Sequence, residues 1–240
     1  IGECTASGCT PTTKRIALDA TSNHTSGGEE LVQANGASLT LVYGGSQVGG
    51  PRVYLIEEEG VNKNHMFMLK GREFTFDVEL SQMPCGFNAA LYFVGMQEND
   101  GGAEAGTFYC DAQAVDGTFC SELDVMEANT QAQQYTTHAC IDTCGSFNKD
   151  AQECKGNGSP SSVCDQSGCG LNPFRYGPGT TYNNEYNNNE WYGPGSAFAL
   201  DSTKVFTAVT QFHTGPSGNL VNVTRFYLQN DVRIDLPTLY

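Results

Sequence analysis

Basic residues and long apolar runs are both scarce in this 240-residue chain. There are 12 Lys and Arg against 27 Asp and Glu, which gives a formal net charge of -15 at pH 7. Such a surface repels phosphate backbones, which argues against nucleic acid as a partner. No apolar run approaches the roughly 20 residues of a membrane-spanning helix, so we expect no membrane partner either. Neutral or cationic partners remain compatible with this charge.

Zinc-binding patterns are also missing. The chain has 10 Cys, but none of them form C-x-x-C pairs or the Cys/His sets that hold zinc. This many cysteines is high for a reduced cytosol, so we interpret them as disulfides. Possible N-glycosylation sites at Asn23, Asn157 and Asn222 agree with secretion. The opening Ile1–Cys4 lacks a charged and then apolar signal segment, so we expect a processed, secreted, extracellular protein.

Strand patterns dominate, and no long helix is predicted. Residues 73–80 alternate strictly, and one face of this segment carries Phe74, Phe76, Val78 and Leu80. Further strands are predicted at 38–43, 52–56, 90–94, 204–212, 220–228 and 232–236. We expect the apolar run 90–94 to be buried.

Short strands bounded by Gly, Pro and Asn are typical of an all-β sandwich. A sandwich of this length commonly forms one domain, so we predict a single domain spanning residues 1–240. The stretch 140–190 is rich in Cys, Gly and Asn, and we predict a long loop region held by disulfides.

Three carboxylates lie close together in the stretch Glu122–Glu127. Positions i and i+2 of a strand share a face, so Glu122 and Asp124 should point the same way. Glu127 would face away in a regular strand, but a bulge or strand end near Met126 would return it to that face. Carboxylates that converge in a cleft repel one another, so at least one should hold a proton near neutral pH.

This grouping suits retaining glycoside hydrolysis, in which one ionised carboxylate attacks the anomeric carbon and a second protonates the leaving oxygen. The two groups lie about 5–5.5 Å apart in such enzymes, and a third carboxylate can tune the nucleophile. This chemistry requires no cofactor and no metal. The same residues also fit a solvated acidic strand or a calcium site, and the residues alone leave these alternatives open.

The stretch 120–129 has the sequence Cys-Ser-Glu-Leu-Asp-Val-Met-Glu-Ala-Asn, and further motifs surround it in order. They occupy residues 74–78, 83–94, 109–113, 137–140, 172–175, 192–195 and 209–212. This ordered set covers nearly the whole chain and resembles glycoside hydrolase family 7, the fungal-type cellobiohydrolases and endoglucanases. The resemblance implies a concanavalin-A-like jelly-roll β-sandwich with long disulfide-held loops and a cleft on its concave sheet.

The resemblance also implies roles for individual residues. Glu122 corresponds to the nucleophile, Asp124 to its carboxylate partner and Glu127 to the acid/base. Asp111 and His138 match positions beside these carboxylates. The positions that match glucan-contacting residues are Asn88, Tyr92, Tyr109, Gln113 and Arg175. The implied partner is a β-glucan polysaccharide.

Several positions depart from the family's pattern. Met126 stands where the family usually has Trp, so we expect an altered cleft floor beside the acid/base. Segment 114–118 replaces a longer tunnel-forming insertion, and residues 21–24 replace tryptophans that stack on glucose rings. An open cleft, as in the endoglucanases, fits these changes better than a tunnel. The predicted function is a retaining endo-type β-1,4-glucan hydrolase.

Members of the family continue beyond the counterpart of Tyr240, so the C-terminal part of the family domain is expected to be absent from this chain. The only Trp is Trp191, and the loops around the cleft are short. These features leave a second hypothesis open, a catalytically idle relative that acts as a glycan-binding or structural extracellular protein.

The resemblance pairs eight of the cysteines: Cys4 with Cys9, Cys110 with Cys120, Cys140 with Cys164, and Cys144 with Cys154. The family partners of Cys85 and Cys169 lie in the C-terminal region. We therefore expect these two to be free thiols, or to be bonded to a second polypeptide or to that C-terminal part, and not to each other.

Overall fold

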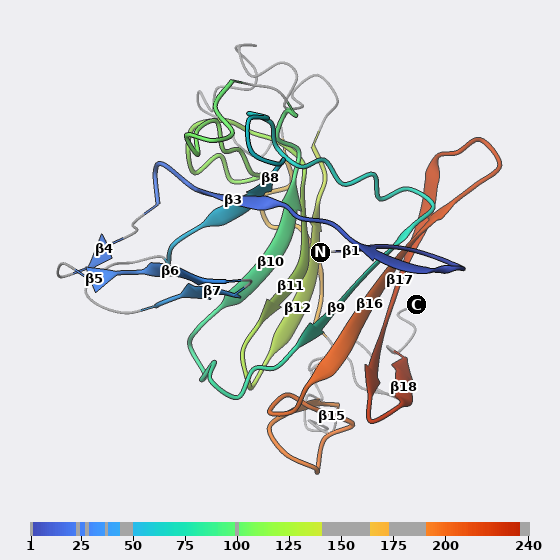
Figure 1. Cartoon of the computed structure of the whole chain (residues 1–240). Helices are drawn as coiled ribbons and strands as arrows, with labels where there is room; N and C mark the ends of the chain where they lie inside the picture. Colours follow the sequence, from blue (N-terminus) through green and yellow to red (C-terminus); the bar gives the residue numbers. More distant parts are fainter. Residues whose placement is uncertain are drawn as a thin grey trace. The chain divides into compact units, whose positions relative to one another are not determined.

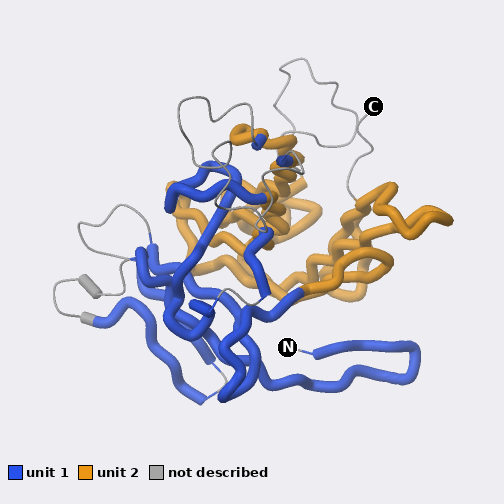
Figure 2. The backbone as a smooth tube through the Cα atoms, turned by 90° about the horizontal axis from the view of Figure 1, so that it is seen from above, with its two compact units in different colours: residues 1–66, 95–120, 140–164 blue, residues 67–94, 121–139, 165–240 orange. Residues whose placement is uncertain are grey.

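The computed structural model describes residues 2–22, 25–26, 29–36, 38–43, 50–98, 101–140, 164–172 and 191–235. The described residues contain no helix, and so none that is long and apolar enough to cross a membrane. The chain divides into two compact units, which Figure 2 colours separately. Unit 1 comprises residues 1–66, 95–120 and 140–164, and unit 2 comprises residues 67–94, 121–139 and 165–240.

Unit 2 is built on two four-stranded antiparallel sheets (Figure 1). The first, here called the carboxylate sheet, has the order β10 (Ala89–Val94), β11 (Glu122–Ala128), β12 (Gln133–His138) and β13 (Cys169–Leu171). The second, the backing sheet, has the order β18 (Val232–Asp235), β17 (Leu220–Gln229), β16 (Phe206–Thr214) and β9 (Glu73–Val78). A short parallel pair joins β14 (Tyr192–Gly193) to β15 (Leu200–Asp201).

One hydrophobic core lies between the two sheets of unit 2. Met126 and Ala128 of β11 share a buried cluster with Phe206 and Ala208 of β16 and Tyr227 of β17. Burial of such side chains is the main favourable term in folding. The alternation seen in residues 73–80 places Phe76, Val78 and Leu80 against this cluster. The predicted all-β sandwich is therefore confirmed.

The strand predictions agree with the structure to within a few residues over β7 (Ser38–Leu41), β8 (Val53–Ile56), β9, β10, β16, β17 and β18. Asn230 and Asp231, with φ of 53° and 61°, join β17 to β18. Positive φ at both central residues is typical of the tight type I′ hairpin turn, which Asn and Asp tolerate.

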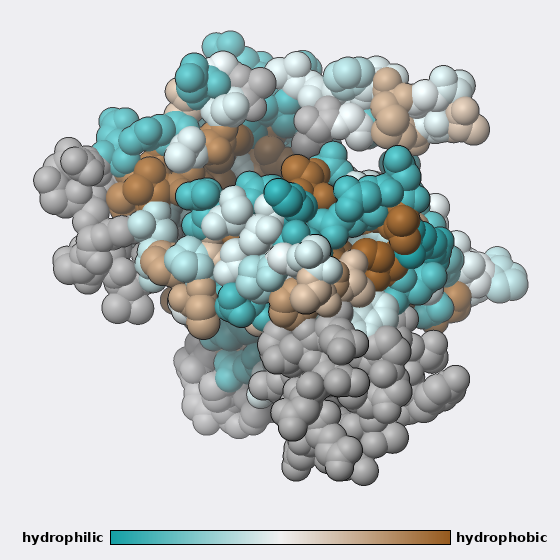
Figure 3. Space-filling view, turned by 90° about the horizontal axis from the view of Figure 1, so that it is seen from below, coloured by the Kyte–Doolittle hydropathy of each residue, from teal (hydrophilic) through white to brown (hydrophobic). Residues whose placement is uncertain are grey.

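The expected burial of residues 90–94 is wrong in part. Leu91 is 41% exposed. The physical reason is that β10 is an edge strand of the carboxylate sheet, so its side chains are covered from one flank only. On the face seen in Figure 3, apolar side chains (brown) likewise reach the surface between hydrophilic ones (teal). Scattered exposed apolar residues of this kind are normal in soluble proteins.

Unit 1 consists of short antiparallel pairs. They are β1 (Gly2–Thr5) with β2 (Gly8–Pro11), β3 (Arg15–Leu18) with β8, β4 (Thr25–Ser26) with β5 (Glu29–Glu30), and β6 (Val32–Asn35) with β7. A small core of Ala17, Ile56 and Ala103 holds β3 and β8 together. That residues 1–240 act as one domain stays a prediction.

The described part of the chain holds three disulfides, Cys4–Cys9, Cys110–Cys120 and Cys140–Cys164, and each is a pair that the resemblance implies. The pair Cys144–Cys154 lies outside the described residues. Of the predicted loop 140–190, residues 169–171 form strand β13, and much of the remainder lies outside the described part. Asn222 is exposed on β17, whereas Asn23 and Asn157 are outside the described residues.

Cys85 and Cys169 are exposed and free. When the 240-residue chain is produced in an oxidising compartment, we expect about two thiols per chain to react with a thiol reagent under native conditions. C85S and C169S should each remove one. A Cys85–Cys169 peptide in a non-reducing digest would contradict this expectation.

Candidate active site

Strand β11 carries a β-bulge between Asp124 and Glu127. On β10, Tyr92 lies opposite Asp124 and the preceding residue, Leu91, lies opposite Met126. Val125 is therefore an extra residue with no counterpart on β10. The register between β11 and β12 shifts at the same place, between Asp124 and Glu127. This two-against-one count defines a bulge, and it lies where the spacing of the carboxylates predicts one.

The bulge places all three carboxylates on one face of the carboxylate sheet. Leu123 lies opposite Phe93, whose ring contacts Phe74 of the backing sheet, so this side of β11 faces the core. Side chains alternate along a strand, so Glu122 and Asp124 point away from the core. Beyond the extra residue, Met126 and Ala128 return to the core and Glu127 joins the other two carboxylates.

The expectation that Met126 alters the cleft floor is wrong. Its side chain is 2% exposed and lies in the core between the two sheets. Because Met126 and Glu127 are consecutive residues on a strand, they point to opposite faces. The residue at this position therefore affects core packing beneath the acid/base and not the surface beside it.

His138 and Asp124 form a buried pair. His138 lies opposite Glu122 across the β11–β12 ladder, and its Nε2 is 3.1 Å from Asp124 Oδ2. Its Nδ1 is 2.7 Å from the carbonyl oxygen of Asp165, which only accepts, so Nδ1 carries a proton. The contact between Nε2 and Oδ2 then needs one further proton, on either the imidazole or the carboxyl group. The contact is a hydrogen bond only while the two groups hold this proton between them, and a pair that holds it carries no net charge.

The pKa of Asp124 reflects the same arrangement. Burial, followed by the negative charges of Glu122 and Glu127, raises the pKa of Asp124 to about 7, and His138 opposes the shift. A raised pKa in a like-charge cluster is what the sequence predicts for at least one of the three carboxyl groups. Groups whose pKa values are pushed apart by their surroundings are common at catalytic sites.

Gly168, which sequence reasoning missed, allows this position of His138. It has φ of +68°, and a Cβ atom added there would lie 2.6 Å from His138 Cε1 and 2.4 Å from Thr136 Cγ2. Only glycine adopts this conformation freely and also lets the backbone approach so closely. The signal in the sequence is the Gly of the segment Asp165–Gly168, but nothing local links it to His138.

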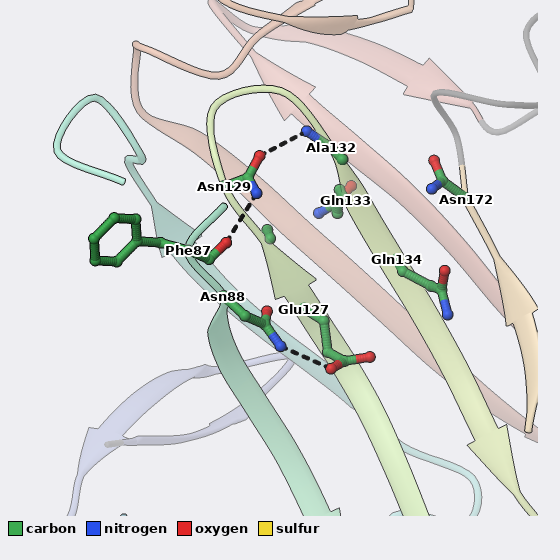
Figure 4. Close-up of a pocket in the computed structure, with 9 residues that line it drawn as sticks. Phe87, Asn88, Glu127, Asn129, Ala132, Gln133, Gln134 and Asn172 are labelled. Carbon is green, nitrogen blue, oxygen red and sulfur yellow. Dashed lines mark hydrogen bonds between the residues drawn. The ribbon is translucent and has the colours of Figure 1, made fainter. Parts of the chain in front are cut away.

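A hollow of about 260 Å³ lies beside Glu127. Asn88 donates from Nδ2 to Glu127 Oε1 over 2.8 Å (Figure 4). The lining residues come from β11, β12 and the segments next to β10 and β13: Phe87, Asn88, Glu127, Ala128, Asn129, Ala132, Gln133, Gln134 and Asn172. The amides around this carboxyl group offer donors and acceptors suited to hydroxyl-rich ligands. Gln134 and Asn129 are further lining residues that sequence reasoning missed.

Asn129 shapes the turn after β11. Its Oδ1 accepts from the backbone N–H groups of Gln131 and Ala132 over 2.8 and 3.0 Å, and its Nδ2 donates to the carbonyl of Phe87 over 2.8 Å. The bond to Phe87 ties the β11–β12 turn to the segment that carries Asn88. Asn88 is thereby held beside Glu127 by this bond to the neighbouring residue as well as by its own side chain.

The remaining predicted residues are distributed over both units. Tyr92 lies opposite Asp124 and so on the same face of the carboxylate sheet. Asp111, Tyr109 and Gln113 belong to unit 1. Arg175 lies outside the described residues. The structure thus brings together Glu122, Asp124, Glu127, His138, Asn88 and Tyr92 in unit 2.

The residues in unit 1 have local partners. Asp111 is 3% exposed, and its Oδ1 accepts from the backbone N–H of Val115 over 3.1 Å, which closes the loop that follows Cys110. Tyr109 is buried beneath Arg52, whose guanidinium carbon lies 3.4 Å from the ring centroid. Gln113 is exposed. The roles of these residues toward a glucan stay predictions.

Among the described residues, no group of three or more His, Cys, Asp and Glu side chains is placed to hold a metal ion.

The shifted pKa of Asp124 predicts a pH dependence of stability. Because the folded-state pKa of about 7 lies above the ordinary value of 3.8, the folded chain binds more protons than the unfolded chain between these values. The stabilisation is complete below about pH 4 and is lost as the pH rises through 7. Asp124→Asn keeps a donor toward His138 but cannot ionise, so the free energy of unfolding of the wild type relative to this variant should fall over that range. Denaturant titrations between pH 4 and 8 measure this, and a constant difference would contradict it.

Comparisons with known proteins identify the family. The family model for glycosyl hydrolase family 7 matches residues 26–118 and 114–239. Endoglucanase 1 of Pyricularia oryzae is 37% identical over 235 residues, covering 89% of this chain and 51% of that protein. The chain thus spans about half the length of such relatives.

Solved structures show the same likeness. The native endocellulase EGI of Humicola insolens superposes with a TM-score of 0.72 at 29% identity, covering 98% of this chain and 70% of that one. An endoglucanase I complexed with cellobiose gives a TM-score of 0.70 at 28% identity, with the same coverage of 98% and 70%. Because the family model matches most of this chain, the chain belongs to glycosyl hydrolase family 7.

Proposed function

We propose that this protein is a secreted, retaining endo-type β-1,4-glucan hydrolase. The observation that carries the proposal is the bulge in β11, which puts Glu122, Asp124 and Glu127 on one face beside His138. Relatives of this chain are named endoglucanases, and one similar structure holds cellobiose. The three disulfides support an extracellular location, because such bonds persist in oxidising compartments.

In the proposed first step, a carboxylate oxygen of Glu122 attacks the anomeric carbon of the glucan. The bond from that carbon to the leaving oxygen breaks, and Glu127 gives its proton to this oxygen. The product is a glycosyl ester on Glu122. In the second step, the Glu127 carboxylate takes a proton from water, whose oxygen attacks the anomeric carbon and releases Glu122. Two inversions give net retention of configuration.

The Asp124–His138 pair supports the ionisation that this mechanism needs. With a shared proton the pair is neutral, so Glu122 has one negative neighbour fewer and stays ionised at a lower cost. Asn88 donates to Glu127 Oε1 and so fixes the orientation of the acid/base. Acid–base assistance depends on such positioning as much as on pKa.

The proposed substrate contacts come from residues of both units. Asn88, Tyr92, Tyr109, Gln113 and Arg175 are the proposed glucan-binding residues. The short segment 114–118 and the residues at 21–24 support an open groove and not a tunnel. Cys85 and Cys169, which are exposed, are the proposed points of attachment for a second polypeptide or for the C-terminal part of the family domain.

A catalytically idle, glycan-binding protein is the second candidate. The feature in its favour is the absence of tryptophan at residues 21–24, where the family carries residues that stack on glucose rings. Hydrolysis of a soluble β-glucan by the chain separates the two candidates, because binding without release of reducing ends is expected only of the second.

Glu122→Gln should remove nearly all hydrolysis, since an amide cannot act as the nucleophile, while binding of cello-oligosaccharides remains measurable. Glu127→Gln should lower kcat by about 10²–10⁴-fold, the usual contribution of general acid–base help. Initial rates and calorimetric binding measure both effects. Glu98→Gln, an exposed change in unit 1, is the control. Full activity in either site variant would sink the proposed mechanism.

The products test the endo-acting, retaining assignment. An open groove should give random internal cuts, so the viscosity of a soluble β-1,4-glucan should drop well before much reducing sugar appears. NMR of the fresh products should show the β-anomer first. Dominant release of cellobiose from chain ends would contradict the open groove, and initial α-anomer would contradict the double displacement.

A further inference from the structure

Arg225 of β17 is buried directly beneath the bulge of β11. It lies opposite Thr210 of β16, and 8% of it is exposed. Its Nη1 donates to the backbone carbonyl of Val125, the extra residue of the bulge. An arginine of the backing sheet thus reaches across the core to the backbone that separates Asp124 from Glu127.

Arg225 is itself held by two other side chains. Nη1 also donates to Thr210 Oγ1 over 3.2 Å, and Nε donates to Tyr227 Oη over 2.9 Å. Tyr227 Oη in turn donates to Gln133 Oε1 of β12 over 2.5 Å. The network therefore connects two strands of the backing sheet to two strands of the carboxylate sheet through Nε and Nη1, while the buried Nη2 of Arg225 has no hydrogen-bond partner among the described residues.

At the bulge, the carbonyl of Val125 requires a hydrogen-bond donor, and Arg225 supplies one. Val125 has no register partner on β10 or on β12, so its carbonyl has no place in the regular pattern of hydrogen bonds between strands. A buried carbonyl without a partner is costly, and a charged donor forms one of the stronger hydrogen bonds available. The hydrogen-bond partners of Arg225 among the described residues are neutral oxygens, so this buried charge is not there to complete an ion pair.

We propose that Arg225 is a positioning residue for the carboxylates. Its bond to the Val125 carbonyl sets the bulge, and the bulge sets where Glu127 stands relative to Glu122 and Asp124. The expected effect of Arg225 on kcat rests on the proposed hydrolase function. The expected effect of Arg225 on the bulge does not depend on that function.

Arg225→Met is the direct test, because methionine keeps an apolar stem and removes the donors. We expect kcat on a soluble β-1,4-glucan to fall about 10–100-fold, as small displacements of catalytic groups do, with KM changed by less than about threefold. Arg225→Lys, which can bond Val125 but not Thr210 and Tyr227 together, should fall in between. Arg233→Met on the neighbouring β18, where Arg233 is exposed and pairs with Asp235, is the matched control and should keep wild-type kcat.

Two further measurements keep the test decisive. If Arg225→Met does not fold, Tyr227→Phe removes only the hydroxyl that holds Nε, and it should lower kcat severalfold with circular dichroism unchanged. A crystal structure of the folded variant should show a changed register between Asp124 and Glu127, or loss of the contact from Asn88 to Glu127. This readout stands even if the wild type proves inactive, which would defeat only the proposed function. Wild-type kcat, or lost activity with the bulge and the Asn88 contact unchanged, would overturn the inference.

Discussion

The insertion of Val125 into β11 is the constraint on which the site depends. A strand alternates its side chains, and Asp124 and Glu127 are an odd number of residues apart. Without an extra residue, one of these carboxyl groups would be buried in the core or Met126 would be exposed. With it, Leu123, Met126 and Ala128 all face the backing sheet while three carboxyl groups face away from it. The hydrophobic core and the acidic site are therefore satisfied by the same local irregularity.

Electrostatics then decides what the three carboxyl groups can do. Like charges on one face of the sheet oppose ionisation, and burial together with these charges raises the pKa of Asp124 to about 7. His138 relieves it by sharing a proton, and the carbonyl of Asp165 determines which imidazole nitrogen is available. An amide in place of the Asp124 carboxyl group would cost less to bury, so this position reduces stability and keeps a titratable group. Titratable groups with shifted pKa values are common at catalytic sites.

The backing sheet contributes more than apolar surface. Tyr227 packs in the core cluster and also anchors Arg225 and Gln133, so apolar packing and hydrogen bonding act through one side chain. A buried guanidinium is expensive unless its donors are satisfied, and among the described residues Arg225 Nη2 has no partner. Arg225 donates to the Val125 carbonyl, which has no register partner at the bulge. This bond links the backing sheet to the carboxylate sheet. The disulfides of unit 1 act differently, because they restrict the unfolded chain and have no part in this network.

Alternation and carboxylate spacing are local patterns, so the residues alone predicted the fold class, most strands of the sandwich and a bulge or strand end near Met126. The three disulfide pairs followed from the resemblance to the family. Sequence reasoning misplaced Met126, since the face of a residue beside a bulge depends on which residue is the extra one. It missed Gly168, Asn129, Gln134 and the partnership of Arg225 with Val125. These residues are 100 positions apart in the last case, and no local pattern records such a contact. Only the packing of one sheet on the other decides it, because the carbonyl that needs a donor exists only once the bulge has formed.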